Sequence, residues 1–211
     1  MGNYFSQDGI VLETGFKRYS VKLNSETKVF DNVKFGNMVN LSHDKRFSGD
    51  YNIKNTMLAL PTQPIYNPDG SYAGPEGTPM YAGDIQNPIG KAKLIDKTTL
   101  GYNLIGSIYT EITFLKDFQF KSTYGLQANC WNDRTWSPKY NWTPTPQELS
   151  YLSEYSNKSI TWNFDNVLTY NKTLDVHKIT LMAGTTAQEN TFSFVGGFKQ
   201  KFASDLTQPL S

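Results

Sequence analysis

The chain has 211 residues, and its 20 basic residues nearly balance its 19 acidic ones, which leaves a formal net charge of +1. The basic residues are scattered, so the composition excludes a surface for nucleic acid. No apolar run approaches the roughly 18 residues of a transmembrane helix. The composition does not exclude a membrane β-barrel, because the strands of such a barrel turn only every second residue toward lipid.

Aromatic residues make up 14% of the chain, with 13 Tyr and 13 Phe, which is more than a core alone requires. Such residues gather in girdles at the two surfaces of a membrane and in loops that stack on sugars. The one cysteine, Cys130, follows Leu126 and Ala128 in an apolar row, and we interpret it as a packing residue.

The first part of the sequence predicts the end of a strand at residues 3–11 and a hairpin at residues 16–43, with its turn at Phe30–Asn32. Apolar and polar side chains alternate along both arms, as on a strand whose two faces meet different surroundings. The apolar row comprises Tyr19, Val21, Leu23, Thr27, Val29, Val33, Phe35, Val39 and Leu41.

A long irregular segment, residues 44–96, is rich in Pro, Gly and Asn and is predicted to be a loop. Within it, residues 52–60 are expected to form a short helix that ends before Pro61. The run Asn67–Gly70 is interpreted as a turn rather than a calcium loop, because it lacks the later bidentate Glu of that motif.

Two more hairpins are predicted, at residues 99–131 with a turn at Leu115–Asp117 and at residues 160–189 with a turn at Lys172–Asp175. The alternation is cleanest in the first of these two. Residues 191–211 are predicted to form either the start of another strand or a loop.

The second long loop is predicted at residues 132–158, where Thr145–Glu148 has the form of a helix start. Rings before and within this loop form the one candidate binding site, because rings beside hydrogen-bonding groups suit both sugars and peptides. The candidate substrate-contacting residues are Trp131, Trp136, Tyr140 and Trp142, close in sequence to Asn132, Asp133 and Arg134. The alternative is that these rings only pack the loop.

Short turns at one end of the hairpins and long connections at the other predict an all-β fold, an antiparallel up-and-down meander that is part of a large transmembrane β-barrel with long extracellular loops. Strands of about 12 to 15 residues are long enough to cross a bilayer at a tilt. The apolar rows are expected to face lipid and the polar rows an aqueous lumen. Two alternatives stay open, a soluble β-sandwich that binds carbohydrate and a small self-contained barrel.

The sequence carries no motif of an enzyme or a cofactor site. The two histidines, His43 and His177, have no Cys or His at ligand spacing. The carboxylates Glu26, Glu111 and Asp165 are predicted to belong to a polar lining rather than to a catalytic pair. We therefore predict a protein that is not an enzyme and uses no metal or cofactor.

Six runs of the sequence carry a family resemblance. They are residues 4–11 (YFSQDGIV), 16–24 (FKRYSVKLN), 33–37 (VKFGN), 59–72 (which contains PIYNPDGSY), 162–166 (WNFDN) and 168–173 (LTYNKT). Together they resemble the barrel of SusC/RagA-type TonB-linked outer-membrane receptors, and the resemblance extends over nearly the whole chain.

The resemblance implies a nutrient importer of a Gram-negative, Bacteroidota-type outer membrane, with a barrel of about 22 strands and an N-terminal plug. The partners it implies are a SusD-like surface lipoprotein, TonB acting through the N-terminal part, outer-membrane lipid, and a glycan or peptide substrate. The four candidate rings then contact either the substrate or the lipoprotein. Because the sequence contains no plug and opens without an export signal, residues 1–211 are predicted to be one partial barrel domain, an internal fragment of a receptor.

Overall fold

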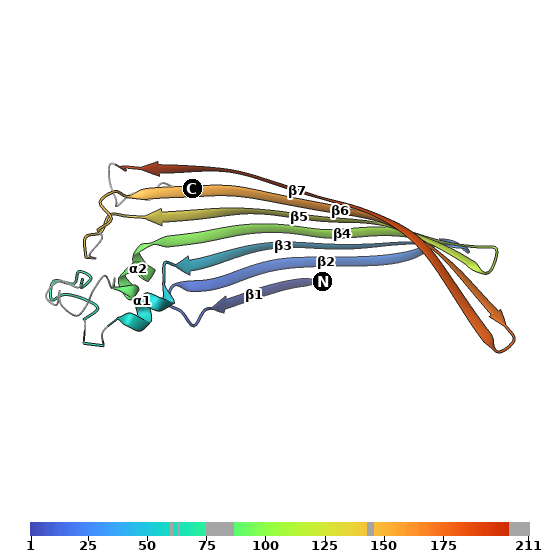
Figure 1. Ribbon diagram of the computed structural model, residues 1–211, viewed down its shortest axis with the longest axis horizontal. Helices are drawn as coiled ribbons and strands as arrows, with labels where there is room; N and C mark the ends of the chain where they lie inside the picture. The colour runs from blue at the N-terminus through green and yellow to red at the C-terminus, as the bar shows by residue number, and fades with distance from the viewer. Residues whose placement is uncertain (60, 63, 75–86, 143–145, 203–211) are drawn as a thin grey trace.

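The computed structural model describes residues 1–59, 61–62, 64–74, 87–142 and 146–202. Within these residues, seven strands form one antiparallel sheet in which each strand pairs with its neighbours in the sequence (Figure 1). The strands are β1 (Gly2–Asp8), β2 (Thr14–Phe30), β3 (Val33–Gly49), β4 (Asp96–Phe114), β5 (Phe118–Ser137), β6 (Tyr151–Leu174) and β7 (His177–Gln200), and the helices are α1 (Ile53–Leu58) and α2 (Pro88–Leu94). The predicted all-β up-and-down meander is confirmed.

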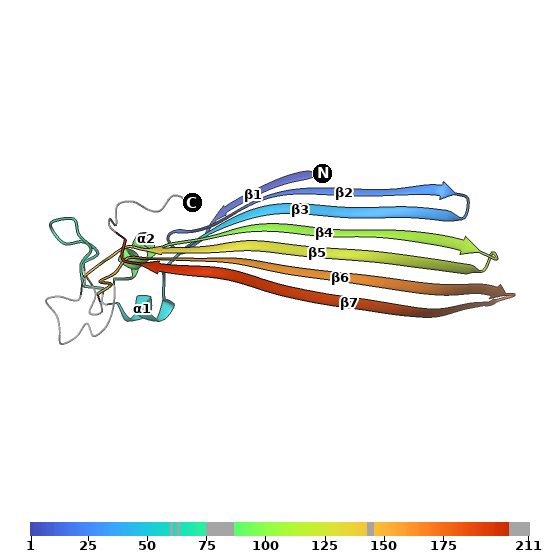
Figure 2. The same cartoon turned by 90° about the horizontal axis from the view of Figure 1, so that it is seen from above.

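The two ends of the sheet differ as the sequence predicts. One end has three tight turns, at residues 31–32, 115–117 and 175–176. The other end carries the long connections and both helices (Figure 2). The third turn, predicted near residues 172–175, does include Asp175 but starts later than predicted, because Thr173 still pairs with Lys178 in the ladder. Asp175 makes that turn with a left-handed φ of 53°.

The strands extend into both predicted loops. Residues 44–49 pair with residues 96–101, and residues 132–137 pair with residues 151–156, so the loops are 50–95 and 138–150 instead of 44–96 and 132–158. Charged residues there interrupt the apolar alternation, but the ladder continues because its hydrogen bonds join backbone groups. β6 and β7 each reach 24 residues, and residues 191–200 belong to β7.

The helix predicted at residues 52–60 is confirmed over Ile53–Leu58, while Leu60 lies outside the described residues. The helix start predicted at Thr145–Glu148 is wrong over its described part, where Gln147 bridges to Tyr140. Thr145 itself lies outside the described residues. None of the described helices is long and apolar enough to cross a membrane.

The helix α2 was not predicted from the sequence, although its start carries a recognisable signature. Asn87 caps it by accepting a hydrogen bond from the backbone of Gly90 at 3.0 Å, and proline follows the cap. The same Asn87 side chain donates to the carbonyl groups of Ile65 and Ala73 at 2.8 and 3.0 Å. One side chain therefore starts the helix and ties residues 65–73 of the long loop to it.

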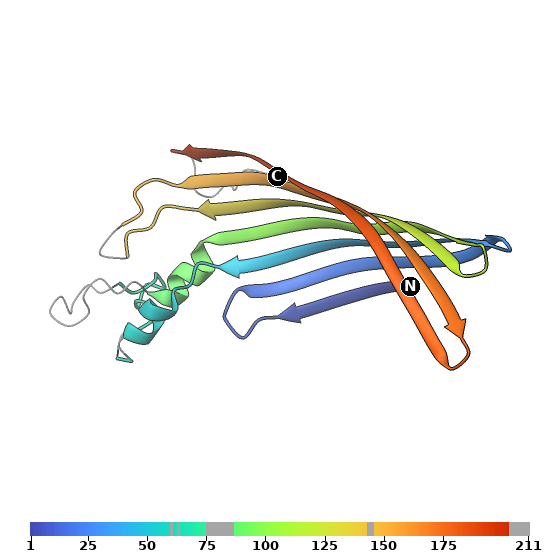
Figure 3. The same ribbon diagram turned by 45° about the vertical axis from the view of Figure 1, so that its right-hand side comes forward.

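The ladder places alternate residues of all strands on two faces. Val21 pairs with Leu41, which pairs with Leu104. We call the side with these residues and their cross-strand partners the apolar face, and the side with Ser20 and Ser42 the polar face. Figure 3 shows one twisted layer, with the β6–β7 turn swung away from the other turns. The β-sandwich alternative is wrong for the described residues, because a sandwich needs two packed sheets.

Candidate functional site

Rings on the apolar face gather at two levels, which we call the outer band, near the loops, and the inner band, near the tight turns. The contacts of the outer band are Tyr4–Tyr19 and His43–Tyr102, with ring centroids 4.8 and 4.5 Å apart. The contacts of the inner band are Phe114–Phe118 and Phe118–Tyr170, at 5.6 and 4.8 Å. On β4 the bands are about 40 Å apart along the strand, given a rise of about 3.4 Å per residue. At a tilt of about 40° this corresponds to about 30 Å, the thickness of bilayer hydrocarbon.

Between the two bands, the apolar face exposes its side chains. Leu23 is 61% exposed, Leu41 49% and Ile108 47%. Soluble monomers rarely present a continuous apolar surface of this size. Cys130 is exposed on the same face, opposite Tyr102, so the interpretation of it as a residue packed within this chain is wrong.

The polar face is crossed by hydrogen bonds between strands. Asp133 accepts from Thr99 at 2.7 Å and from Asn157 at 3.1 Å, which joins β4, β5 and β6. Asp44 is 6% exposed and accepts from Asn103 at 2.8 Å. The three carboxylates predicted to line this side each take a different partner, which is Tyr109 for Glu26, Lys34 for Glu111 and Thr186 for Asp165. Each of the three carboxylates is therefore hydrogen-bonded or ion-paired on the polar face.

At the loop end, the polar face changes character and carries aromatic rings. The Trp131 ring lies 6.1 Å from Phe192, and Phe192 lies 6.1 Å from Phe194. Tyr155 covers Gly196, where an added Cβ would clash with the ring. We call Trp131, Tyr155, Phe192 and Phe194 the ring cluster. Phe192 and Phe194 are 55% and 66% exposed, so the cluster presents free ring surface beside the Asp133 hydrogen bonds.

The structure separates the four residues predicted to contact substrate. Trp131 belongs to the ring cluster, whereas Trp136 is 2% exposed and meets Phe202 edge-on at 5.0 Å. Tyr140 and Trp142 stack on each other at 5.0 Å within loop 138–150. Burial, followed by the negative charge of Asp50, raises the pKa of Tyr140. Only Trp131 of the four therefore lies on an open surface of the sheet.

The aromatic partners of Trp131 were missed at the sequence level. Phe192 and Phe194 lie in residues 191–211, for which the sequence predicts either a strand or a loop. Once β7 is continued through this segment, its register places Phe194 opposite Asn157, and Asn157 opposite Trp131. The signal was the alternation of Phe192 and Phe194 themselves, two positions apart.

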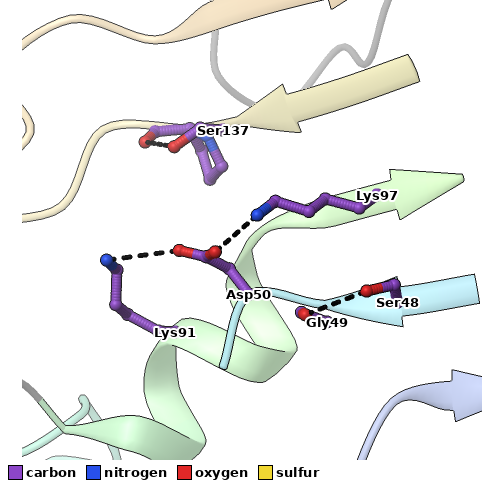
Figure 4. Close-up of polar contacts among 7 residues, drawn as sticks. Ser48, Gly49, Asp50, Lys91, Lys97 and Ser137 are labelled. Carbon is purple, nitrogen blue, oxygen red and sulfur yellow. Dashed lines mark hydrogen bonds and ion pairs between the residues drawn. The ribbon is translucent and has the colours of Figure 1, made fainter. Parts of the chain in front are cut away.

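The base of the long loop is fixed by a charged contact between three elements. Asp50, which follows β3, binds Lys91 of α2 at 3.2 Å and Lys97 of β4 at 2.5 Å (Figure 4). Burial disfavours the charged carboxylate, but the hydrogen bonds and charges of the two lysines outweigh burial and hold the pKa of Asp50 below its ordinary value. Within the described ranges, no three His, Cys, Asp or Glu side chains gather where a metal ion could bind.

No family model matches this chain. Its sequence is 31% identical over 215 residues to TonB-dependent receptor P26 of Formosa agariphila, which covers 97% of this chain and 21% of that protein. It is 25% identical over 208 residues to TonB-dependent receptor P3 of the same organism, covering 92% of this chain and 20% of that protein. The chain thus spans about a fifth of the length of the curated relatives it matches.

Solved structures of the RagAB peptide importer share the fold. The TM-score is 0.76 for its closed-closed state and 0.78 for its open-open state, at 22% and 21% identity, over 97% of this chain and 24% of that one. By sequence the chain is similar to part of a TonB-dependent receptor, and by fold to part of the RagAB importer, which bears out its resemblance to the barrel of SusC/RagA-type receptors. The seven-stranded meander is thus similar in fold to part of that barrel. The relatives are receptors and an importer, which is consistent with the prediction that the chain is not an enzyme.

Proposed function

We propose that the chain forms part of the wall of a TonB-dependent importer in the outer membrane of a Gram-negative, Bacteroidota-type cell. The observation that carries this proposal is the apolar face bounded by two bands of rings about 30 Å apart. The apolar face contacts lipid, and the hydrogen-bonded polar face lines the lumen.

In this proposal, residues 1–211 are one partial barrel domain that needs further strands. β7 is exposed along all 24 residues, and one edge of it has no pairing strand among the described residues. Hydrocarbon offers no hydrogen bonds to an unpaired strand edge. The outer edges of β1 and β7 therefore pair with other strands of the receptor.

The ring cluster contacts the substrate at the outer end of the lumen. Its exposed rings, with Asp133 and Asn157 beside them, suit an oligopeptide or a glycan. The similarity to a peptide importer supports the first of these. TonB supplies the energy through the N-terminal part of the receptor, and a SusD-like lipoprotein covers the mouth. Tyr140 and Trp142 shape the loop that faces it, and Trp136 packs at the loop's base.

Spin labels on neighbouring residues test which face meets lipid. The full-length receptor in bilayers carries a single label, either on the native Cys130 of the apolar face or on Trp131→Cys of the polar face in a Cys130→Ser background. We expect oxygen, which concentrates in lipid, to reach the first label, and a water-soluble nickel chelate to reach the second. The reverse pattern, or two water-exposed labels, would overturn the proposal.

Uptake assays test the substrate-contacting role separately. We expect Trp131→Ala with Phe194→Ala to reduce uptake at least about tenfold, since stacked rings contribute up to about 1.5 kcal/mol each. Phe164→Leu, on the apolar face, is the matched control and should leave uptake unchanged. Normal uptake by the double variant at wild-type surface levels would remove the ring cluster from the proposal.

A further inference from the structure

Two lysines lie on the apolar face just beyond the outer band. Lys17 of β2 and Lys45 of β3 are directly opposite each other in the ladder, two positions closer to the loops than Tyr19 and His43. Two residues correspond to about 7 Å along a strand, or about 5 Å in height at a tilt of about 40°. If the outer band marks the edge of the hydrocarbon, both ammonium groups lie at the level of the lipid headgroups.

The two lysines have no acidic partner in the described part of the chain. Both ammonium groups lie over the same ring, that of Phe47, at 5.9 Å from Lys17 and 4.7 Å from Lys45. Like charges directly opposite each other in a sheet are destabilising. Asp8, the acid on this face of β1, pairs with Gly15 and makes no ion pair with either lysine.

A basic residue on the same face of β5 shows the contrast. Arg134 makes ion pairs with Glu154 at 3.2 Å and with Asp96 at 3.7 Å, so its charge is balanced within the protein. Lys17 and Lys45, by contrast, place two positive charges without an acidic partner directly opposite each other on adjacent strands. An anion held between the two ammonium groups would remove their repulsion and form two charge-assisted hydrogen bonds.

Space for a larger group adjoins this charge. Lys45 lines a hollow of about 810 Å³ together with Thr98, Leu100, Asn132 and Ser156. Its other charged lining residues are Asp96, Asp133, Arg134, Glu154 and Lys199. Its wall combines hydroxyl, amide and carboxylate groups with the apolar Leu100 side chain. The carboxylates disfavour a phosphate inside the hollow but can accept hydrogen bonds from the hydroxyl groups of a sugar or glycerol unit. This arrangement suits a headgroup whose phosphate lies between the two lysines and whose sugar or glycerol unit enters the hollow.

We propose that Lys17 and Lys45 bind the phosphate of an outer-leaflet lipid, with the rest of the headgroup in the hollow beside Lys45. The proposal rests on the proposed contact of the apolar face with lipid. A lipid bound there would fix the height and orientation of this part of the wall in the membrane.

Binding of lipid A to the full-length receptor in detergent tests the site. The variants are Lys17→Gln with Lys45→Gln and, as a control of equal charge change on the polar face, Lys22→Gln with Lys178→Gln. We expect the first pair to weaken binding of phosphorylated lipid A about tenfold and the control pair to leave it unchanged. Dephosphorylated lipid A should bind all three proteins equally weakly.

Two outcomes would overturn the inference: unchanged affinity in the Lys17–Lys45 variant, or equal wild-type affinity for the two forms of lipid A. The spin labels at Cys130 and Trp131 are read in the same preparations. If they place the apolar face in lipid while binding is unaffected, only the lipid site fails. If they place it in water, the proposed function fails as well.

Discussion

The two faces of the sheet share one backbone but differ in their side chains. On the apolar face, side chains contact each other through rings at two levels and leave aliphatic groups exposed between them, as at Leu23 and Ile108. On the polar face, Asp44 and Asp133 accept hydrogen bonds from neighbouring strands. The backbone ladder holds the strands together, while the two rows of side chains differ in the way the proposed wall requires, with one row for lipid and one for water.

This contrast reverses at the loop end. There the apolar face carries charges, such as Lys45 and Arg134, and the polar face carries the ring cluster around Trp131. In the proposed wall, this level lies beyond the hydrocarbon, so the lipid side can bear charge. The rings on the other side face the lumen there and suit the ligand contact that we propose. The role of an aromatic or charged side chain therefore depends on its position along the strand as well as on its face of the sheet.

The largest effect is expected from a charge placed at the middle of the apolar face. Ile108→Arg should destabilise the full-length receptor in lipid vesicles by about 2–4 kcal/mol, because Arg at the bilayer midplane loses its hydration. Ser107→Arg, one residue away on the polar face, should cost less than about 1 kcal/mol. Denaturant unfolding in vesicles measures both. Equal effects of the two substitutions would contradict the assignment of the faces.

A smaller effect is expected from removing a hydrogen-bond acceptor of the polar face. Asp133→Ala leaves Thr99 and Asn157 without their shared partner and should cost about 1–3 kcal/mol in the same unfolding measurement. Asp31→Ala is the control, since the ion pair of Asp31 with Lys28 lies fully exposed in a tight turn. It should cost no more than about 0.5 kcal/mol. A neutral Asp133 variant would show that the lining is held by the backbone alone.

The smallest effect concerns the loop base and depends on pH. Because the pKa of Asp50 in the folded protein is below its ordinary value of 3.8, the contact with Lys91 and Lys97 contributes above that value and is lost as the pH falls below it. The contribution should be about 1 kcal/mol and local to α2. Protease digestion of the loop should accelerate as the pH falls below about 4 in the wild type. In Asp50→Asn it should be fast at every pH, and an unchanged pH profile would contradict the role of Asp50.

The sequence predicted the structure best where a local pattern of apolar and polar residues dominates. Alternation identified the two faces of β2 to β5, and the tight turns at Phe30–Asn32 and Leu115–Asp117 were placed correctly. The strand ends were misplaced because residues 44–49 and 132–137 have mixed side chains, and pairing there is decided by the neighbouring strand. α2 was missed although Asn87 and Pro88 mark its start, since proline-rich surroundings favoured a loop.

The sequence by itself determined that this chain is an antiparallel wall with an apolar and a polar face and which family it resembles, because a period of two and short turns are local properties of the chain. Only the tertiary structure decided which rings meet. It placed Trp131 with Phe192, buried Trp136, stacked Tyr140 on Trp142 and set Lys17 against Lys45. Those contacts depend on the register between strands and on the fold of the loops, which join residues far apart in the sequence.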